Sequence, residues 1–327
     1  MVPRNSLAGG HYERRLTLRS NLLILFLLFV LVGCVTAPPT PTPAPVTEAT
    51  ATLVPTSAPV NDAPTFADRV RNAPYAMGIL DSRQVVPLTN GVYETGVPGG
   101  ADFISVRVLD FVANGDLNGD GRDEVAALVS ENYGGTGVFV FLVVYADVDG
   151  TLAYQNSVIV DDRPQVNALS IENGEIFLDA VVHGTDEPMC CPTLRTARHY
   201  HLSSLNQIDL VEYATFTPAG TPRTITIEAP PSGAEVMSSV QVRGSVAIAP
   251  FENSLAYRIY DLAGVELSAG AITVNAPDLG APGTFDAVIK FGNSLSGAGA
   301  VVRLEVQDIS AADGSLLAMD SIELVVK

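Results

Sequence analysis

The chain has 327 residues, of which 47% are hydrophobic and 17% are charged, and its net charge is −18 at pH 7. This length allows two domains of ordinary size, each with its own hydrophobic core. The acidic balance argues against a nucleic-acid partner, because phosphates are bound by basic surfaces, and three cysteines are too few for the disulfide framework of a small secreted domain.

The N-terminus has the pattern of an export signal. Arg14, Arg15 and Arg19 precede an apolar run at 22–32, and Cys34 follows closely. The run is shorter than the roughly 20 residues that a permanent membrane-spanning helix needs, and it has the length of a signal-peptide core. The alternative is an uncleaved signal anchor with an incidental cysteine, which the short run disfavours.

The end of this run carries a recognisable motif. Leu31-Val32-Gly33-Cys34 resembles the lipobox of bacterial lipoproteins. The resemblance implies a signal peptide at 1–33, cleavage before Cys34 and a diacylglycerol on the sulfur of that cysteine. The chain would then be extracytoplasmic and anchored to the cell membrane, since two acyl chains give stable attachment where one is marginal.

The next segment is predicted to be a linker. Residues 35–65 are mostly Pro, Thr, Ala and Val, with almost no charge. Proline fixes the backbone φ angle and lacks an amide donor, so helices and central strands are disfavoured. We expect 34–65 to form an extended spacer, in part polyproline II, that lifts the folded part off the membrane.

Residues 66–215 are predicted to form a β-rich or α+β domain. A short helix is expected at 66–72. Apolar runs rich in β-branched and aromatic residues follow, bounded by turn residues, as is typical of strands. The clearest strands are predicted at 104–112, 124–130, 138–147, 157–160 and 175–182, and weaker ones at 197–202 and 206–213.

The sharpest motif of this region is an oxygen-rich loop at 116–124. Its candidate metal ligands are Asp116, Asn118, Asp120, the backbone carbonyl of Arg122, and Glu124. Oxygens at alternate positions, with Gly121 for the sharp turn, suit a hard cation such as calcium. Ala127 stands where an EF-hand has its bidentate glutamate, so an EF-hand is not expected. The alternative is a polar turn that binds no metal.

The loop also resembles the short calcium loops of FG-GAP-type β-repeats. In those repeats the carboxylate at the ninth position binds calcium and a strand follows, as residues 125–129 would provide here. We expect any bound ion to be structural rather than catalytic. FG-GAP loops usually recur around a propeller, and the sequence holds no second copy, so a propeller is not expected.

Cys190 and Cys191 are adjacent in the chain. Export favours oxidation, which predicts a vicinal disulfide; two free, buried thiols are the alternative. A zinc site made of His183, His199, His201 and one cysteine is a further alternative, although the cysteines lack CxxC spacing. The oxygen-rich loop followed by Cys-Cys-Pro is similar to uncharacterised bacterial envelope proteins, which imply no activity.

Residues 223–327 show the strand spacing of an immunoglobulin-like sandwich. Strands are predicted at 224–228, 240–248, 255–261, 266–274, 284–291, 301–308 and 316–326. The Cys…Trp…Cys core of antibody domains is absent from the sequence, since the chain contains no tryptophan. We therefore expect a β-sandwich that is not of the antibody type.

Ordered motifs in this region carry a second resemblance. They are Ile225-Thr226-Ile227-Glu228-Ala229-Pro230-Pro231-Ser232-Gly233-Ala234, Val240-Gln241-Val242-Arg243-Gly244, Phe251-Glu252, Asp261-Leu262-Ala263-Gly264, Gly283-Thr284-Phe285 and Asp308-Ile309-Ser310-Ala311-Ala312-Asp313-Gly314. Together they resemble the immunoglobulin-like domain of bacterial spore germination proteins, the Gmad2 type. The resemblance implies an extracytoplasmic adhesion or interaction module without catalytic residues, and it does not imply sporulation.

The sequence holds few signs of catalysis. It has no Gly-x-Ser-x-Gly, no His-Glu-x-x-His and no phosphate-binding loop. We expect a non-catalytic binding or scaffold module of the cell envelope, stabilised by calcium, whose partner is a protein or a cell-wall polymer. The alternative is an envelope enzyme, either a hydrolase or a thiol-redox protein.

Overall fold

The computed structural model describes residues 64–79, 83–290 and 299–327. The predicted signal peptide, Cys34 and nearly all of the predicted linker lie outside these ranges. The described chain is mainly β, which confirms the predicted fold class, and one helical turn opens it. No helix in the described ranges is both long and apolar enough to span a bilayer.

The first element, α1 (Phe66–Val70), begins at a capping box. The backbone N–H of Asp68 donates to the Thr65 hydroxyl at 3.2 Å, and the Thr65 N–H donates to the Asp68 carboxylate at 3.0 Å. These two bonds satisfy amide groups that a helix start leaves free. Two short paired strands follow, β1 (Pro74–Ala76) and β2 (Val85–Pro87), and the three elements contribute to the core on one face of the next sheet.

That sheet is antiparallel and five-stranded. It consists of β3 (Val92–Thr95), β4 (Ile104–Gly115), β5 (Glu124–Asn132), β6 (Phe139–Val148) and β7 (Thr151–Asp162). Strand β5 is buried on both faces: Val125, Ala127 and Val129 face the core that α1 covers, whereas Ala126 and Leu128 face the next layer. Burial on both faces explains the unbroken apolar run that predicted this strand.

The next layer contains β8 (Gln165–Glu172), β9 (Glu175–Val182), β10 (Leu194–Leu202) and β11 (Ile208–Thr215), again antiparallel. Leu178 and Tyr200 of this layer share a core with Leu128 and Leu142 of the five-stranded sheet. Region 66–215 is therefore a β-sandwich with an additional cover of α1, β1 and β2.

The C-terminal region is also a two-layered β-sandwich. Its strands are β12 (Ile225–Ala229), β13 (Ala234–Val236), β14 (Ser239–Val246), β15 (Ser254–Asp261), β16 (Glu266–Asn275), β17 (Gly283–Lys290), β18 (Val301–Ile309) and β19 (Leu316–Val326). One layer has β12, β14 and β17, the other has β15, β18 and β19, and β16 pairs with both. Val242 and Phe285 of the first layer pack with Leu255 and Leu304 of the second. The predicted immunoglobulin-like sandwich is confirmed.

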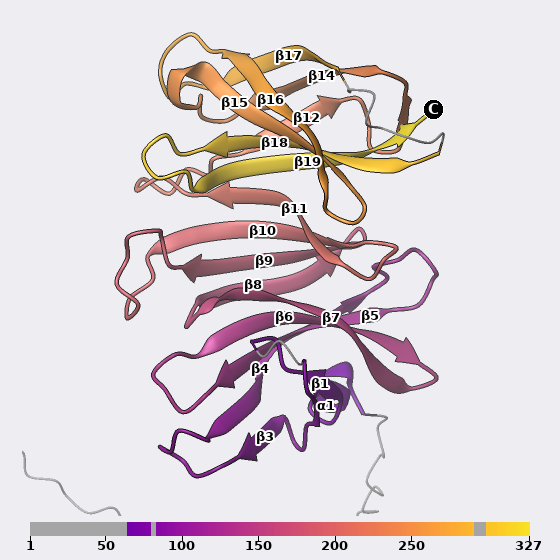
Figure 1. Ribbon diagram of the computed structural model, residues 1–327, viewed down its shortest axis with the longest axis vertical. Coiled ribbons are helices and arrows are strands. Elements are labelled where there is room, and N and C mark those ends of the chain that lie inside the picture. Colours follow the sequence, from indigo (N-terminus) through magenta and orange to yellow (C-terminus); the bar gives the residue numbers. More distant parts are fainter. Residues whose placement is uncertain (1–63, 80–82, 291–298) are drawn as a thin grey trace, which may run out of the picture. The chain divides into compact units, whose positions relative to one another are not determined.

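The two regions share one sheet (Figure 1), because β11 pairs with β19 through three residue pairs, Glu212 with Asp320, Tyr213 with Met319 and Ala214 with Ala318. The face of this sheet that is buried in a core differs between the two regions, and the change occurs where β11 pairs with β19. Leu178, which is in register with Arg198 and Tyr213, faces the core of region 66–215. Val306, which is in register with Asp320, lies on the other face and packs in the C-terminal core.

Candidate functional site

The predicted metal loop connects β4 to β5 and is folded around Asp116. The carboxylate of Asp116 accepts the backbone N–H groups of Gly119 at 2.7 Å and Gly121 at 2.8 Å. Both glycines have φ near +80°, a conformation that favours glycine. Asn118 and Asp120 accept the N–H groups two residues further on, at 2.9 and 2.8 Å. The predicted ligands are thus gathered in one compact loop.

Glu124 closes this loop from the buried side. Its side chain accepts the backbone N–H of Leu117 and the amide of Asn118, both at 2.9 Å, and the residue is 3% exposed. Burial raises the pKa of Glu124, and the negative charges of Asp120 and Asp116 add to that rise. Among the described residues no arginine or lysine forms an ion pair with these three carboxylates.

The donor set fits a calcium ion by its chemistry. Carboxylates keep lone pairs beyond those used by one or two N–H donors, and a divalent cation would relieve the repulsion that raises the pKa of Glu124. As placed, no three His, Cys, Asp or Glu side chains of the described chain converge on one metal position. The amide nitrogen of Asn118 faces Glu124 and Asp120 is exposed, so both side chains would have to reorient to place their oxygens on an ion. Calcium at this loop stays a prediction.

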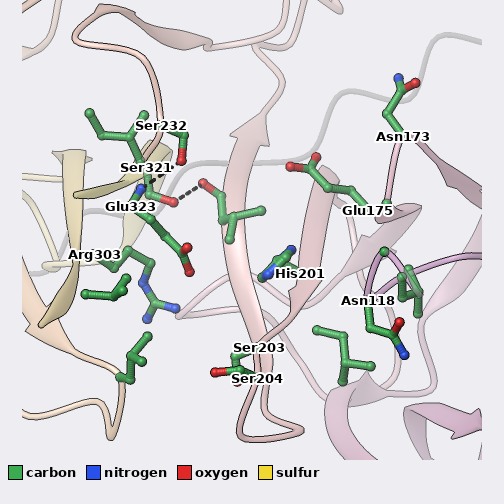
Figure 2. A pocket seen from close by; sticks show the side chains of 18 of the residues that line it. Asn118, Asn173, Glu175, His201, Ser203, Ser204, Ser232, Arg303, Ser321 and Glu323 are labelled. Carbon is green, nitrogen blue, oxygen red and sulfur yellow. Dashed lines mark hydrogen bonds between the residues drawn. The ribbon is translucent and has the colours of Figure 1, made fainter. Parts of the chain in front are cut away.

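One side of the loop forms a wall of a cavity of about 980 Å³ (Figure 2). The cavity lies beside the edge of β19 along which two different strands, β11 and β13, pair with β19. Residues 318–320 pair with β11 and residues 324–326 pair with β13, so the edge at 321–323 is free of strand partners. There Ser321 donates its hydroxyl to the Val211 carbonyl at 2.8 Å, and the Glu323 N–H donates to Ser232 at 3.1 Å. We call this space the junction cavity.

The junction cavity is lined by residues of both regions, and its wall is polar and apolar in nearly equal parts. Its labelled residues in Figure 2 are Asn118, Asn173, Glu175, His201, Ser203, Ser204, Ser232, Arg303, Ser321 and Glu323. Arg303 contributes a guanidinium group to the cavity wall. Two of its nitrogens lie 3.0 Å from carboxylate oxygens, one of Asp209 and one of Glu305. Sequence analysis missed Arg303 and Glu323 as site residues, because only the β11–β19 pairing brings them to the same cavity as Asn118 and no local motif marks them.

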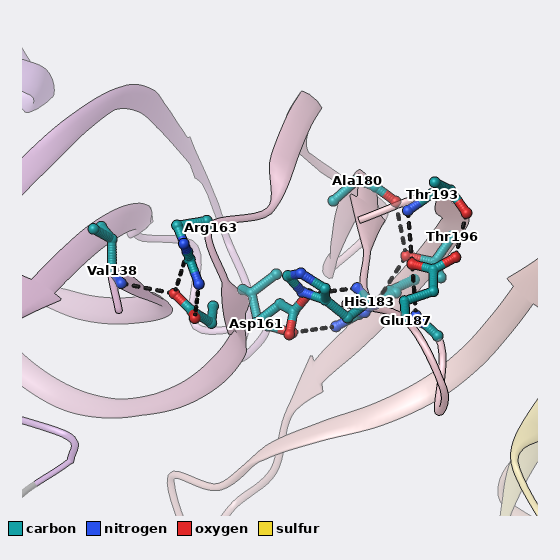
Figure 3. A network of polar contacts seen from close by, with 12 residues as sticks. Val138, Asp161, Arg163, Ala180, His183, Glu187, Thr193 and Thr196 are labelled. Carbon is teal, nitrogen blue, oxygen red and sulfur yellow. Dashed lines mark hydrogen bonds and ion pairs between the residues drawn. The ribbon is translucent and has the colours of Figure 1, made fainter. Parts of the chain in front are cut away.

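The cysteine pair lies in the loop between β9 and β10. The carboxylate of Glu187 accepts the N–H groups of Gly184 at 3.1 Å and Thr193 at 2.8 Å, as well as the Thr193 hydroxyl, and so closes the loop (Figure 3). Cys190 and Cys191 are joined through their sulfur atoms, and both residues are exposed. The alternative of two buried thiols finds no support in this placement.

His183 lies apart from the other two histidines considered for a zinc site. His183 follows Val182, which pairs with Leu194, whereas His199 pairs with Phe177 further along the same two strands. The pair Val182–Leu194 and the pair Phe177–His199 are five residues apart along the strands, which corresponds to roughly 16 Å. His199 instead lies 3.1 Å from Glu175, and His201 lines the junction cavity. The described residues therefore give the zinc alternative no support.

A family model identifies the C-terminal region. None of the curated proteins is significantly similar to the chain. The family model of Gmad2, described as the immunoglobulin-like domain of bacterial spore germination, matches residues 224–315. The match runs from the residue before β12 to the residue before β19. A domain of this kind indicates a binding or structural module rather than an enzyme. The C-terminal region of this chain is a Gmad2-type immunoglobulin-like domain.

Proposed function

We propose that the chain is a membrane-anchored extracytoplasmic lipoprotein that acts as a non-catalytic binding or scaffold module of the cell envelope. The Gmad2-type domain supports the binding role. The lipobox-like motif at Cys34 and the Pro/Thr-rich segment after it support a diacylglycerol anchor with a spacer.

The junction cavity is the observation that carries this proposal. It is lined by the 116–119 loop and the β10–β11 turn on one side and by β18 and β19 on the other. A volume of about 980 Å³ lies at the upper end of the range of ligand pockets. The Gmad2-type domain therefore contributes half of a binding surface, and its partner is a protein segment or a cell-wall polymer.

Calcium has a structural part in this proposal. Asp116, Asn118, Asp120, Glu124 and the carbonyl of Arg122 would hold the ion. Asp116 and Asn118 also line the junction cavity, so an ordered loop would fix one wall of the binding surface.

Two experiments test the proposal. Cys34→Ser should abolish incorporation of a labelled fatty acid and release the chain from the membrane fraction. For binding, the full chain should co-sediment with isolated cell-wall material. Ser204→Trp, at an exposed position in the cavity wall, should weaken that co-sedimentation. Ser238→Trp, at an exposed position that does not line the cavity, should not. Equal recovery of both variants would refute the cavity as the binding surface.

A thiol-redox function is the second candidate, and the exposure of both cysteines favours it. A thiolate of another molecule would attack one sulfur, the Cys190–Cys191 bond would break, and the displaced cysteine would leave as a thiolate. Trapping of a mixed disulfide on Cys190 in the variant Cys191→Ser, which keeps one cysteine of the pair, would support this function. If cells that express this variant yield only chain without a mixed disulfide, the thiol-redox function is excluded.

A further inference from the structure

The junction cavity occupies the fork where β11 and β19 separate. The two strands are joined by only three residue pairs, and the next residue on each strand, Val211 and Ser321, lines the cavity. In the view of Figure 2, Glu323 lies on one side of this space and Glu175 on the other. Carboxylates therefore stand on both sides of the fork.

Glu323 contributes a carboxylate without a partner. Within the described ranges its carboxylate oxygens form neither a hydrogen bond nor an ion pair. Arg303 lies opposite Glu323 in the register of β18 and β19, but its guanidinium is bound to Asp209 and Glu305. Burial raises the pKa of Glu305, yet Asp209 and Glu323 alone outnumber the one guanidinium. This side of the cavity is therefore negative.

Glu175 makes the opposite side negative as well. Its hydrogen bond with His199 lowers the pKa of Glu175, so this carboxylate is charged at neutral pH. The same ring nitrogen of His199 lies 3.8 Å from Glu212, so a protonated His199 would be shared by two carboxylates. Asp116 is a third carboxylate of the cavity wall. A cavity lined by one sign of charge attracts the opposite sign, because its low-dielectric walls concentrate the field.

The placement of these carboxylates suits an extended cation better than a metal ion. No three His, Cys, Asp or Glu side chains of the described residues converge on one metal position. The apolar part of the wall consists of Leu117, Leu202, Val211, Leu262, Val301 and Ile322. A lysine side chain matches both parts of the wall, since its methylene stem packs on apolar surface while its ammonium group stays among polar groups.

The uncharged polar groups of the wall suit a peptide backbone. Asn173, Ser204 and Asn206 line the cavity and are exposed. Amide and hydroxyl side chains can both donate and accept hydrogen bonds, so they can pair with the N–H and C=O groups of a bound peptide. The volume of about 980 Å³ is large for a single side chain and admits a short segment of chain.

We propose that the junction cavity binds a basic peptide segment, with a lysine side chain placed between Glu323 and Glu175. The inference rests on the proposed function and names the class of partner for the same cavity. Arg303 does not turn the cavity into an anion site, because an anion on its guanidinium would also face Glu323 and the two carboxylates that already hold Arg303.

The test measures binding of three short peptides to the full chain by isothermal titration calorimetry. The probe is acetyl-Gly-Lys-Gly-Lys-Gly-amide, and the comparisons have both lysines acetylated or both replaced by glutamate. We expect the lysine peptide to bind, to weaken as the salt concentration rises, and to lose at least about tenfold in affinity on acetylation. Equal binding of the acetylated peptide, binding of the glutamate peptide alone, or no binding of any peptide would overturn the proposal.

A pair of variants separates the cavity from the general acidity of the chain. Glu323→Gln keeps the shape of the side chain and removes its charge, so affinity for the lysine peptide should fall about tenfold. Glu252→Gln removes the same charge from an exposed position that does not line the cavity and should leave the affinity unchanged. Equal losses in both variants would mean that the net charge of −18 attracts the peptide without a site. Circular dichroism melting establishes that each variant is folded, and if Glu323→Gln is not, the acetylated peptide decides.

The partner class and the cavity can fail separately. If Ser204→Trp weakens co-sedimentation with cell-wall material but the unchanged chain does not bind the lysine peptide, the cavity remains the binding surface and the basic partner is refuted. If Ser204→Trp changes neither co-sedimentation nor peptide binding, the cavity itself is refuted, and the inference falls with it.

Discussion

Glu212 and Asp320 lie directly opposite each other across the three-pair ladder that joins β11 to β19. Asp320 accepts the backbone N–H of Ile227 at 2.6 Å. Burial raises the pKa of Asp320 from 3.8 to about 6, and the charges of Glu212 and Glu175 contribute to the rise. Like charges opposite each other destabilise a ladder, so the sheet that unites the two regions carries an electrostatic cost at neutral pH.

The first prediction follows from this cost. Between pH 3.8 and about 6 the folded state binds more protons at Asp320 than the unfolded state, so the free energy of unfolding falls as pH rises through this window. The loss totals about 3 kcal/mol for a shift of about two units. Asp320→Asn keeps an oxygen for the Ile227 N–H and should remove this slope. Urea unfolding at a series of pH values measures it, with the exposed Asp286→Asn in β17 as control; an unchanged slope in Asp320→Asn would contradict the prediction.

His199 adds a second pH dependence at the same place. Its hydrogen bond with Glu175 raises the pKa of His199, and the charges of Glu212 and Asp320 raise it further. A histidine with a raised folded-state pKa contributes stability below its unfolded-state pKa, and this contribution is lost as pH rises through the folded-state value. His199→Gln should therefore lower the unfolding free energy at pH 5 more than at pH 8. Urea unfolding at these two pH values checks this, and an equal loss at both would show that His199 acts by packing alone.

Sequence patterns predicted strands better than they predicted the site. The apolar run 175–182 gave β9 with the bounds that the structure shows, because its buried residues form a compact β-type run. β8, in contrast, was not predicted, since its apolar residues are interrupted by Asn167 and Ser170 and it lies at the edge of its sheet. β1, β2 and β13 have three residues each, which is too short for any periodicity to appear.

The junction cavity could not be predicted from local patterns. Arg303 reaches Asp209 only because β19 pairs with β11. The oxygen-rich loop was visible because its ligands are close in sequence. Residues that meet through long-range strand pairing leave no such trace in a single sequence.

The next prediction concerns the buried Glu131. This residue is fully buried and accepts the N–H groups of Gly78 at 2.6 Å and Ile79 at 3.2 Å, together with the Tyr75 and Tyr133 hydroxyls. Glu131→Gln replaces one acceptor oxygen by a donor that faces other donors. The unfolding free energy should fall by about 3 kcal/mol. Glu94→Gln, in a more exposed pair with Arg107, should cost less than about 1 kcal/mol. Similar losses in urea unfolding would mean that the Glu131 network contributes little.

Calcium binding to the 116–124 loop is tested by melting the chain with calcium and with a chelator. Binding to the folded state alone adds about 2.7 kcal/mol at a hundredfold excess over Kd. Asp120→Asn removes one predicted ligand charge and should abolish the rise in melting temperature. Asp123→Asn is the matched control, because Asp123 bonds to Asn114 and is not a predicted ligand. The absence of any rise with millimolar calcium would make the loop a plain turn.

The last prediction concerns the state of Cys190 and Cys191. Both residues are exposed, so alkylating reagents reach them without unfolding the chain. If export oxidises the pair, native protein from the envelope should not react with iodoacetamide at Cys190 or Cys191. After reduction both cysteines should be labelled. Mass spectrometry of the peptide that contains the loop counts the labels. The Glu187 bonds to Gly184 and Thr193 close the loop independently of the sulfur atoms. Reduction should therefore change the melting temperature less than Glu187→Ala does. Labelling before reduction would show that the pair is carried as free thiols.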